Sequence, residues 1–205
     1  MKKFLLALIL ALIVLTSIQL WFTSQRTDQK NEVEQSTGQG EAQIGGDFTL
    51  TNQFGKTVHA ADFHAKVMLV FFGFTHCPDI CPATMAALSQ TMALLGDKAD
   101  KVTPVFISVD PTRDRPAVLK DFLASFDKRM VGLTGTPEQI KQVAEAYKVY
   151  YSQVDPAGKP TGSADYSIDH SAFIYMMGKD GKYVRLFDYN TPAQEMAHAI
   201  AAYLD

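Results

Sequence analysis

Apolar residues in the part of the chain after residue 46 follow two patterns, one alternating and one continuous. Residues 47–51 and 56–58 alternate between apolar and polar side chains on either side of a turn-forming segment, which predicts an opening β-hairpin. Residues 67–72 are all apolar, as in a strand buried on both faces. Residues 102–109 form the next run of this kind, with Pro104 near its start. We therefore expect a sheet in the interior of this region.

Segments with helical periodicity separate and follow these strands. Pro82 suits the first turn of a helix, and Gly96 supplies a stop. Thr136 is a natural cap for a later helix, and Thr191 followed by Pro192 opens the last one. The apolar positions at helical spacing are Met85, Leu88, Met92 and Leu95; Val118, Leu119, Phe122, Leu123 and Phe126; Ile140, Val143, Ala144 and Tyr147; and Met196, Ala199, Ile200 and Tyr203. Four helices are therefore predicted to pack through these faces.

A second hairpin is predicted near the end of the chain. Residues 171–177 and 182–187 flank a turn at residues 178–181. Residues 149–154 are expected to form a short strand, and residues 155–163 a loop rich in proline, glycine and serine. Strands that alternate with helices favour a parallel sheet covered on both faces, to which the hairpin adds antiparallel strands. The predicted class is α/β, with a central mixed sheet flanked by helices, and the order of its elements resembles the thioredoxin fold.

The first segment combines two lysines with a long apolar run. Lys2 and Lys3 precede residues 4–22, a run close to the roughly 20 residues that cross a bilayer as a helix. A cleaved signal peptide is the alternative, but its apolar region is usually shorter and ends at a small-x-small site, which is lacking here. We therefore expect residues 1–22 to be a single-pass anchor in a bacterial inner membrane, with the lysines in the cytoplasm. Residues 23–46 would be a flexible linker, and residues 47–205 one domain facing the periplasm.

The charge of the chain argues against one class of partner. The formal net charge is −3, and the charged residues are scattered without a basic stripe. Domains that bind nucleic acids usually carry such a stripe. We therefore expect no nucleic-acid partner.

Cys77 and Cys81 are the only cysteines of the chain, and they lie between the strand at residues 67–72 and a predicted helix. A helix N-terminus stabilises a thiolate through its unpaired N–H groups and its dipole. Thiolates bind soft metals and attack disulfides. A structural disulfide here would close a very small loop and so contribute little stability. The pair therefore indicates metal binding, redox exchange, or both.

Residues 72–82, Phe-Gly-Phe-Thr-His-Cys-Pro-Asp-Ile-Cys-Pro, resemble the signature of the SCO/SenC family. Residues 107–114 and 166–171 resemble that family as well, and the resemblance spans residues 48–205. Its members are membrane-tethered, thioredoxin-like copper proteins that help to assemble the copper centre of cytochrome c oxidase. The resemblance implies that Cys77, Cys81 and His170 bind one copper ion per domain, as Cu(I) or Cu(II).

These three residue types suit copper. Thiolates select Cu(I), and imidazole accepts both oxidation states, whereas zinc usually takes a fourth ligand. His170 is far from the cysteines in the sequence, so only the fold can bring it near them. In thioredoxin-like oxidoreductases a cis-proline stands at the corresponding place, so the resemblance puts an imidazole opposite the cysteines instead. Asp169 is expected either to orient that imidazole or only to form a turn.

The remaining candidates have ordinary structural interpretations. His76 is expected to be an exposed loop residue, because neighbouring side chains usually point apart. Asp79 and Asp110 are candidates for tuning the site from nearby, whereas Arg113 and Asp114 are expected to fix a turn. The other histidines lack a partner pattern, and the methionines of the helical stripe suit the core; these residues are His59, His64, His198, Met85 and Met92.

Two functions remain open. The first is a copper chaperone that binds copper near the membrane and passes it to the copper-bearing subunit of cytochrome c oxidase, with other copper chaperones or thioredoxin-like reductants as further partners. The second is a thiol–disulfide reductase, in which Cys77 and Cys81 attack a disulfide of an oxidase subunit or another periplasmic protein. A peroxidase or redox sensor has no specific support. The chaperone, which is not an enzyme, is the leading hypothesis.

Overall fold

Seven strands form the central sheet, in the order β2-β1-β5-β4-β3-β8-β9. The computed structural model describes residues 44–155, 157–162 and 166–205. The strands of this sheet are β1 (Thr49–Asn52), β2 (Thr57–His59), β3 (Val67–Gly73), β4 (Val102–Ser108), β5 (Val131–Thr134), β8 (Phe173–Met177) and β9 (Tyr183–Asp188). Strands β3, β4 and β5 run parallel, and the remaining pairings are antiparallel, so the predicted mixed sheet is confirmed.

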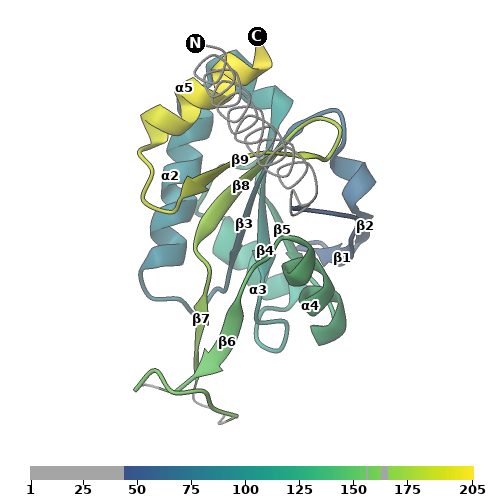
Figure 1. The fold of residues 1–205 in the computed structure, drawn as a ribbon, viewed down its shortest axis with the longest axis vertical. Helices are drawn as coiled ribbons and strands as arrows, with labels where there is room; N and C mark the ends of the chain where they lie inside the picture. The colour runs from purple at the N-terminus through teal and green to yellow at the C-terminus, as the bar shows by residue number, and fades with distance from the viewer. Residues whose placement is uncertain (1–43, 156, 163–165) are drawn as a thin grey trace, which may run out of the picture. The chain divides into compact units, whose positions relative to one another are not determined.

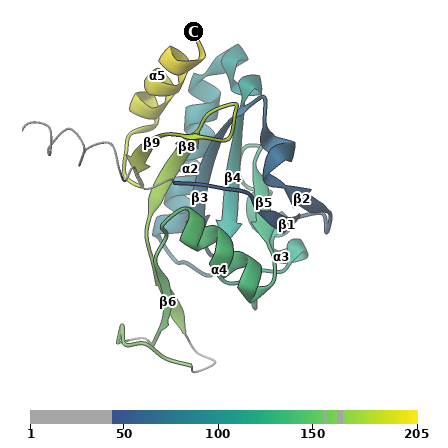
Figure 2. The ribbon, with the colours of Figure 1, turned by 45° about the vertical axis from the view of Figure 1, so that its right-hand side comes forward.

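Helices cover both faces of the sheet. They are α2 (Ile80–Leu94), α3 (Pro116–Leu123), α4 (Pro137–Ala146) and α5 (Ala193–Leu204), with 3-10 turns at Ala60–Phe63 and Gly96–Lys101. Figures 1 and 2 show α4 in front of the strands and α2 and α3 behind them. The aromatic contacts agree, because Phe72 packs on Tyr147 at the end of α4, whereas Phe106 packs on Phe122 of α3.

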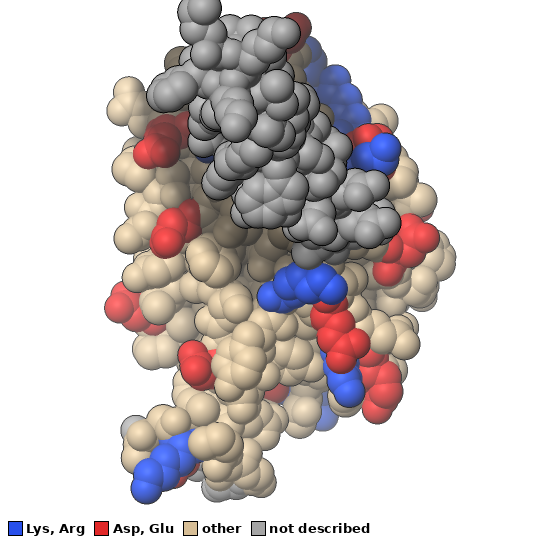
Figure 3. All heavy atoms as spheres, viewed as in Figure 1, with Lys and Arg blue, Asp and Glu red and all other residues tan. Residues whose placement is uncertain are grey.

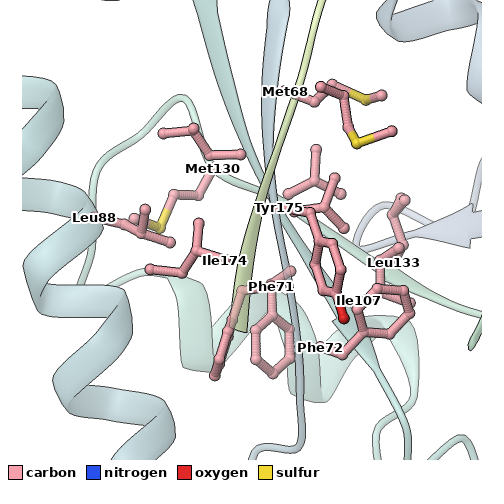
Figure 4. Packing of buried hydrophobic residues seen from close by; sticks show 14 of the residues in the cluster. Met68, Phe71, Phe72, Leu88, Ile107, Met130, Leu133, Ile174 and Tyr175 are labelled. Carbon is pink, nitrogen blue, oxygen red and sulfur yellow. The ribbon is translucent and has the colours of Figure 1, made fainter. Parts of the chain in front are cut away.

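The core follows the apolar pattern of the sequence. Every residue of β3 is buried, as the continuous run at 67–72 predicts. Met85 and Met92 are buried on α2, which confirms their place in the core. Figure 4 shows side chains from β3, β4, β5, β8 and α2 packed together. Thr136 caps α4 as predicted, because its hydroxyl accepts a hydrogen bond from Gln139 N while the Gln139 side chain accepts one from Thr136 N.

Two short strands were not predicted. Strand β5 has Gly132 at its second position, where a Cβ would lie 2.6 Å from Leu123 Cδ1, so close packing of α3 requires the glycine that weakens the strand signal. Strand β7 (Ser167–His170) contains a single apolar residue and pairs with β6 (Tyr151–Val154). The prediction that Tyr203 of α5 faces inward is wrong, since this side chain is 45% exposed.

Strands β6 and β7 form a separate two-stranded antiparallel sheet, which we call the arm. Figure 1 shows the arm extending away from the seven-stranded sheet. His170 is the last residue of β7, paired with Tyr151 of β6. The position of His170 therefore depends on how the arm is attached to the rest of the domain.

The predicted anchor at 1–22 and most of the predicted linker at 23–46 lie outside the described residues. No helix in the described ranges has both the length and the apolar character needed to cross a bilayer. The described domain begins with contacts to the core, because Ile44 packs against it and Gly45 N donates a hydrogen bond to Ala146 O at 2.9 Å.

Candidate metal and thiol site

The cysteine pair lies where β3 passes into α2. Cys77 is in the connecting loop and partly exposed, whereas Cys81 lies in the first turn of α2 and is fully buried. Both are free thiols, and Cys81 N donates a hydrogen bond to Cys77 Sγ at 3.5 Å. The predicted placement of the pair at a helix N-terminus is therefore confirmed.

Gly73 makes room for the buried sulfur. A Cβ on Gly73 would lie 2.8 Å from Cys81 Sγ and 2.9 Å from the Phe106 ring. Real Cβ atoms do not approach neighbours this closely, so a side chain here would displace the sulfur or the ring. The glycine that ends β3 thus allows Cys81 to pack directly on the strand.

The two thiols differ in acidity. The pKa of Cys77 falls to about 5, because the Cys81 thiol donates a hydrogen bond to its sulfur and backbone N–H groups of the helix start add to this. The pKa of Cys81 is raised, because the same hydrogen bond favours its protonated form and burial disfavours its charged form. Cys77 is therefore the more acidic thiol of the pair.

His170 reaches the buried cysteine. Its Nε2 lies 3.7 Å from Cys81 Sγ, and its Nδ1 is 3.0 Å from the carbonyl oxygen of Ser171. A carbonyl only accepts hydrogen bonds, so Nδ1 is the donor to Ser171 and Nε2 is the ring nitrogen that faces the sulfur. The rings of Phe71 and Phe74 meet the imidazole edge-on, with centroids 6.2 Å and 5.9 Å away. Cys77, Cys81 and His170 are thus brought together from residues distant in the sequence.

The orienting role considered for Asp169 is not borne out. Asp169 is exposed, and the Ser171 carbonyl makes the hydrogen bond that fixes the ring instead. A backbone carbonyl serves this purpose as well as a carboxylate does. Asp169 lies next to the ligand candidate, but alternation along β7 turns its side chain to the opposite side.

A buried carboxylate holds the loop that precedes Cys77. Asp114 has no exposed surface and accepts three hydrogen bonds: one from Thr75 N at 2.9 Å, one from the Thr75 hydroxyl at 2.6 Å and one from the Ser108 hydroxyl at 2.6 Å. His76 is half-exposed, with Nδ1 3.8 Å from the same carboxylate. We expected Asp114 to fix its own turn, at residues 110–116. Its side chain instead bonds Ser108 at the end of β4 and Thr75 in the cysteine loop.

Replacing Asp114 with alanine should therefore destabilise the protein. The change removes the acceptor of three donors, one on buried Ser108 and two on half-buried Thr75, which should lower the free energy of unfolding by about 3 kcal/mol. Urea denaturation followed by circular dichroism measures this. Asp121→Ala on the exposed face of α3 is the control and should change stability by less than about 0.5 kcal/mol. A loss for Asp114→Ala as small as that of the control would contradict this account of the loop.

A second polar network joins the loop after β4 to the arm. Asp110 is buried; one carboxylate oxygen pairs with Arg113 Nε, and the other accepts a hydrogen bond from the Tyr166 hydroxyl at 2.8 Å. Arg113 Nη1 donates a hydrogen bond to Tyr166 O at 3.0 Å, and its guanidinium carbon lies 3.8 Å from the centre of the Tyr166 ring. Burial and the hydrogen bond to Asp110 raise the Tyr166 pKa to about 12. Asp110 therefore contacts no ligand candidate itself.

Sequence reasoning missed Tyr166 in this network. A signal was available, because Tyr166, Ile168 and His170 are spaced by two residues, which places them on one face of a strand. Of the other candidates, Asp79 is exposed with no side-chain bond to the helix that it precedes. His59, His64 and His198 are exposed, as expected.

Two soft sulfurs and an imidazole could hold a metal such as copper. In the described part of the chain, no three His, Cys, Asp or Glu side chains already form a ready-made metal cluster. The 3.7 Å from His170 Nε2 to Cys81 Sγ has the scale of neighbouring metal ligands. Cys77 is partly exposed, and its sulfur accepts a hydrogen bond from Cys81 N.

This fold and this site together define a thioredoxin-like domain in which a histidine faces a Cys-x-x-x-Cys pair. The chain belongs to the SCO1/SenC family, whose sequence profile matches residues 36–205. The earlier resemblance to this family is thereby confirmed.

Individual relatives agree with this assignment. The chain is 37% identical to Protein SenC of Rhodobacter capsulatus over 202 residues, which cover 98% of this chain and 89% of that protein. Among its eukaryotic relatives, Protein sco1 of Schizosaccharomyces pombe is 38% identical, and the chain spans 62% of its length.

Solved structures of relatives have the same fold. ScoI of Bradyrhizobium japonicum with copper bound is 44% identical, with a TM-score of 0.71, and the match covers 78% of this chain and 99% of that one. BsSco, described as a member of the Sco family of cytochrome c oxidase assembly proteins with a disulfide switch, is 27% identical, with a TM-score of 0.62; the match covers 80% of this chain and 95% of that one.

Proposed function

We propose that this protein is a copper chaperone for cytochrome c oxidase. It binds one copper ion through Cys77, Cys81 and His170, and delivers the ion to the copper site of the oxidase or prepares that site. The single observation that carries the proposal is the approach of His170 Nε2 to within 3.7 Å of Cys81 Sγ, with Nδ1 held by the Ser171 carbonyl.

The distance between these atoms supports shared coordination. With metal–sulfur and metal–nitrogen distances of about 2.3 Å and 2.0 Å, two ligands of a trigonal ion are roughly 3.7 Å apart. The observed separation is 3.7 Å. Cys77, whose sulfur accepts a hydrogen bond from Cys81 N, completes the set. Copper bound to ScoI, a relative with the same fold, supports the choice of metal.

Transfer of the ion requires a ligand that an acceptor can replace. Cys77 and His170 are partly exposed, so an incoming thiolate or imidazole of the oxidase subunit can approach the ion beside them. The anchor predicted at residues 1–22 would keep the domain at the periplasmic face of the inner membrane, where an oxidase subunit presents its copper site.

Thiol–disulfide exchange is the second candidate function, supported by the unequal acidities of the two thiols. The Cys77 thiolate attacks one sulfur of a partner disulfide, and the other partner sulfur leaves as a thiolate. The Cys81 thiol then gives up its proton and attacks the mixed disulfide at Cys77, which releases the second partner thiol and leaves the Cys77–Cys81 disulfide. The disulfide switch described for BsSco is consistent with such a pair.

A Cu(I) titration tests the chaperone proposal. The reduced full-length chain in mild detergent should bind one Cu(I) per molecule in competition with a chromogenic chelator. His170→Ala should weaken binding by about a hundredfold, equivalent to about 2.7 kcal/mol. The control is His198→Ala on the exposed side of α5, which should leave the affinity unchanged. If His170→Ala binds Cu(I) as tightly as His198→Ala, the ligand set is wrong. If neither variant binds Cu(I) and both reduce disulfides, the reductase function is favoured.

A further inference from the structure

Two segments fix where His170 lies. The chain leaves His170 through Ser171 into the seven-stranded sheet, and it enters β7 from Tyr166. Hydrogen bonds between Tyr150 and Ser171 join the two residues that flank the arm at its base. They do not connect the arm to the cysteine loop. The contacts that tie the arm to the remainder of the domain near the cysteines therefore involve Tyr166 and Ile168.

Tyr166, just before β7, and Ile168 and His170 of β7 share the side that faces the body of the domain. Ile168 is buried in the core. This apolar contact holds the strand against the domain but does not fix its orientation. Tyr166 supplies the directional contacts, because both its hydroxyl and its carbonyl are hydrogen-bonded to the loop after β4. A hydrogen bond at each end of one residue restricts rotation of the strand that follows it.

A continuous stack connects these contacts to the imidazole. The Arg113 guanidinium lies 3.8 Å from the Tyr166 ring centre and 6.0 Å from that of Phe74. Phe74 in turn meets the His170 ring edge-on at 5.9 Å. Arg113 therefore contacts Tyr166 at the start of the arm, Phe74 beside the cysteine loop, and the buried Asp110.

The arrangement is unfavourable for a group that serves only stability. Arg113 Nη2 is buried without a hydrogen-bond partner among the described residues, and an unsatisfied donor is costly. Buried ion pairs are weak evidence for stabilisation, and their best-attested use is to specify one geometry. The planar fork of arginine can bond Asp110 and Tyr166 together while stacking on a ring, which lysine cannot do.

We propose that Arg113 is a positioning residue that clamps the arm and thereby holds His170 over the cysteine pair. The clamp consists of Arg113, Asp110 and Tyr166. The effect of the clamp on copper affinity rests on the proposed function. With the clamp in place the imidazole is held at the metal site, and without it the arm and the imidazole move away from that site. The clamp itself is a property of the metal-free protein.

The first measurement therefore uses the metal-free, reduced full-length chain in detergent micelles. Nuclear Overhauser contacts between the His170 and Phe74 rings should be observed in the wild-type protein. Arg113→Gln should abolish them and move the His170 ring resonances toward positions free of ring-current shifts. Arg115→Gln makes the same chemical change at an exposed position of the same loop and is the matched control. Contacts that persist in Arg113→Gln overturn the proposal.

The second measurement is Cu(I) affinity by chelator competition. Arg113→Gln should weaken binding by about 10- to 100-fold, as for other residues that orient a metal-ligating histidine. Tyr166→Phe keeps the ring and the carbonyl and should lose less than Tyr166→Ala. The rate of Cys77 alkylation should stay within about twofold of the wild type, since the clamp acts on the histidine side of the site. If Arg113→Gln slows Cys77 alkylation by as large a factor as it weakens copper binding, the substitution disrupts the whole site, and the proposal is overturned.

Two further outcomes are distinguishable. If Arg113→Gln does not fold, Tyr166→Ala leaves the Asp110–Arg113 pair intact and tests the same attachment from the arm. If the wild-type protein binds no copper, the proposed function fails, yet the ring contacts in the metal-free protein still decide whether the clamp exists.

Discussion

Replacing Cys81 with serine should abolish Cu(I) binding, with a loss of affinity of at least about a thousandfold, or about 4 kcal/mol. The substitution is nearly isosteric, but a hydroxyl oxygen is a hard and weakly acidic ligand that does not select Cu(I). Cys81 Sγ also lies 3.7 Å from His170 Nε2, so its loss removes the sulfur that faces the imidazole. Competition with a chromogenic Cu(I) chelator measures the affinity of the reduced protein.

The control for this substitution is Ala86→Ser on the exposed side of α2, which adds a hydroxyl away from the site. Circular dichroism should show the same fold for both variants, since neither changes side-chain volume by much. If the Cu(I) affinity of Cys81→Ser is within tenfold of that of the wild type, the metal is held elsewhere and the ligand assignment is wrong.

Alkylation should distinguish the two cysteines by more than a hundredfold at pH 6. With a pKa of about 5, Cys77 is mostly thiolate at that pH, whereas an ordinary cysteine near pKa 8.5 is thiolate in only about 0.3% of molecules. Cys81 is buried, and its raised pKa keeps it protonated. The Cys77 rate should rise as the pH increases through about 5 and then level off, because deprotonation of a group with a lowered pKa is complete above that value.

Mass spectrometry of iodoacetamide-treated protein at a series of pH values measures both rates. Cys77→Ser is the companion variant, in which only Cys81 remains and labelling should be slow until the protein unfolds. A Cys77 rate that keeps rising up to pH 8 or 9 would show that its thiol is not acidified, and the assignment of Cys77 as the nucleophile would fail.

The sequence predicted the elements that carry a continuous or strongly periodic pattern. Strand β3, helix α2 and the position of the cysteines between them follow from an apolar run, a proline and a helical stripe. Strands β5 and β7 could not be recognised this way, because β5 contains Gly132 for contact with α3 and β7 has only Ile168 as an apolar residue. Their strand structure depends on partners that only the fold supplies.

The site divides in the same way. Proximity of Cys77 and Cys81 is a local property and was readable from their spacing. The place of His170 came from the resemblance to the SCO/SenC family, since no local pattern links residue 170 to residue 81. The two-residue spacing of Tyr166, Ile168 and His170 indicated a shared face. The contacts of Tyr166 with Asp110 and Arg113 could not be predicted, because they join separate segments. Figure 3 likewise shows acidic and basic residues interspersed over the visible face, which gives no electrostatic guide to this site.

The enclosure of Cys81 between α2 and Gly73 sets an order for ligand exchange. An acceptor cannot approach the ion from the side of this sulfur, because the strand backbone and the Phe106 ring occupy that space. Substitution would therefore begin at Cys77 or His170, and the bond to Cys81 would be the last to break. Such a sequence would keep the ion attached to its carrier until the acceptor has supplied most of its own ligands, so that no free copper is released between them.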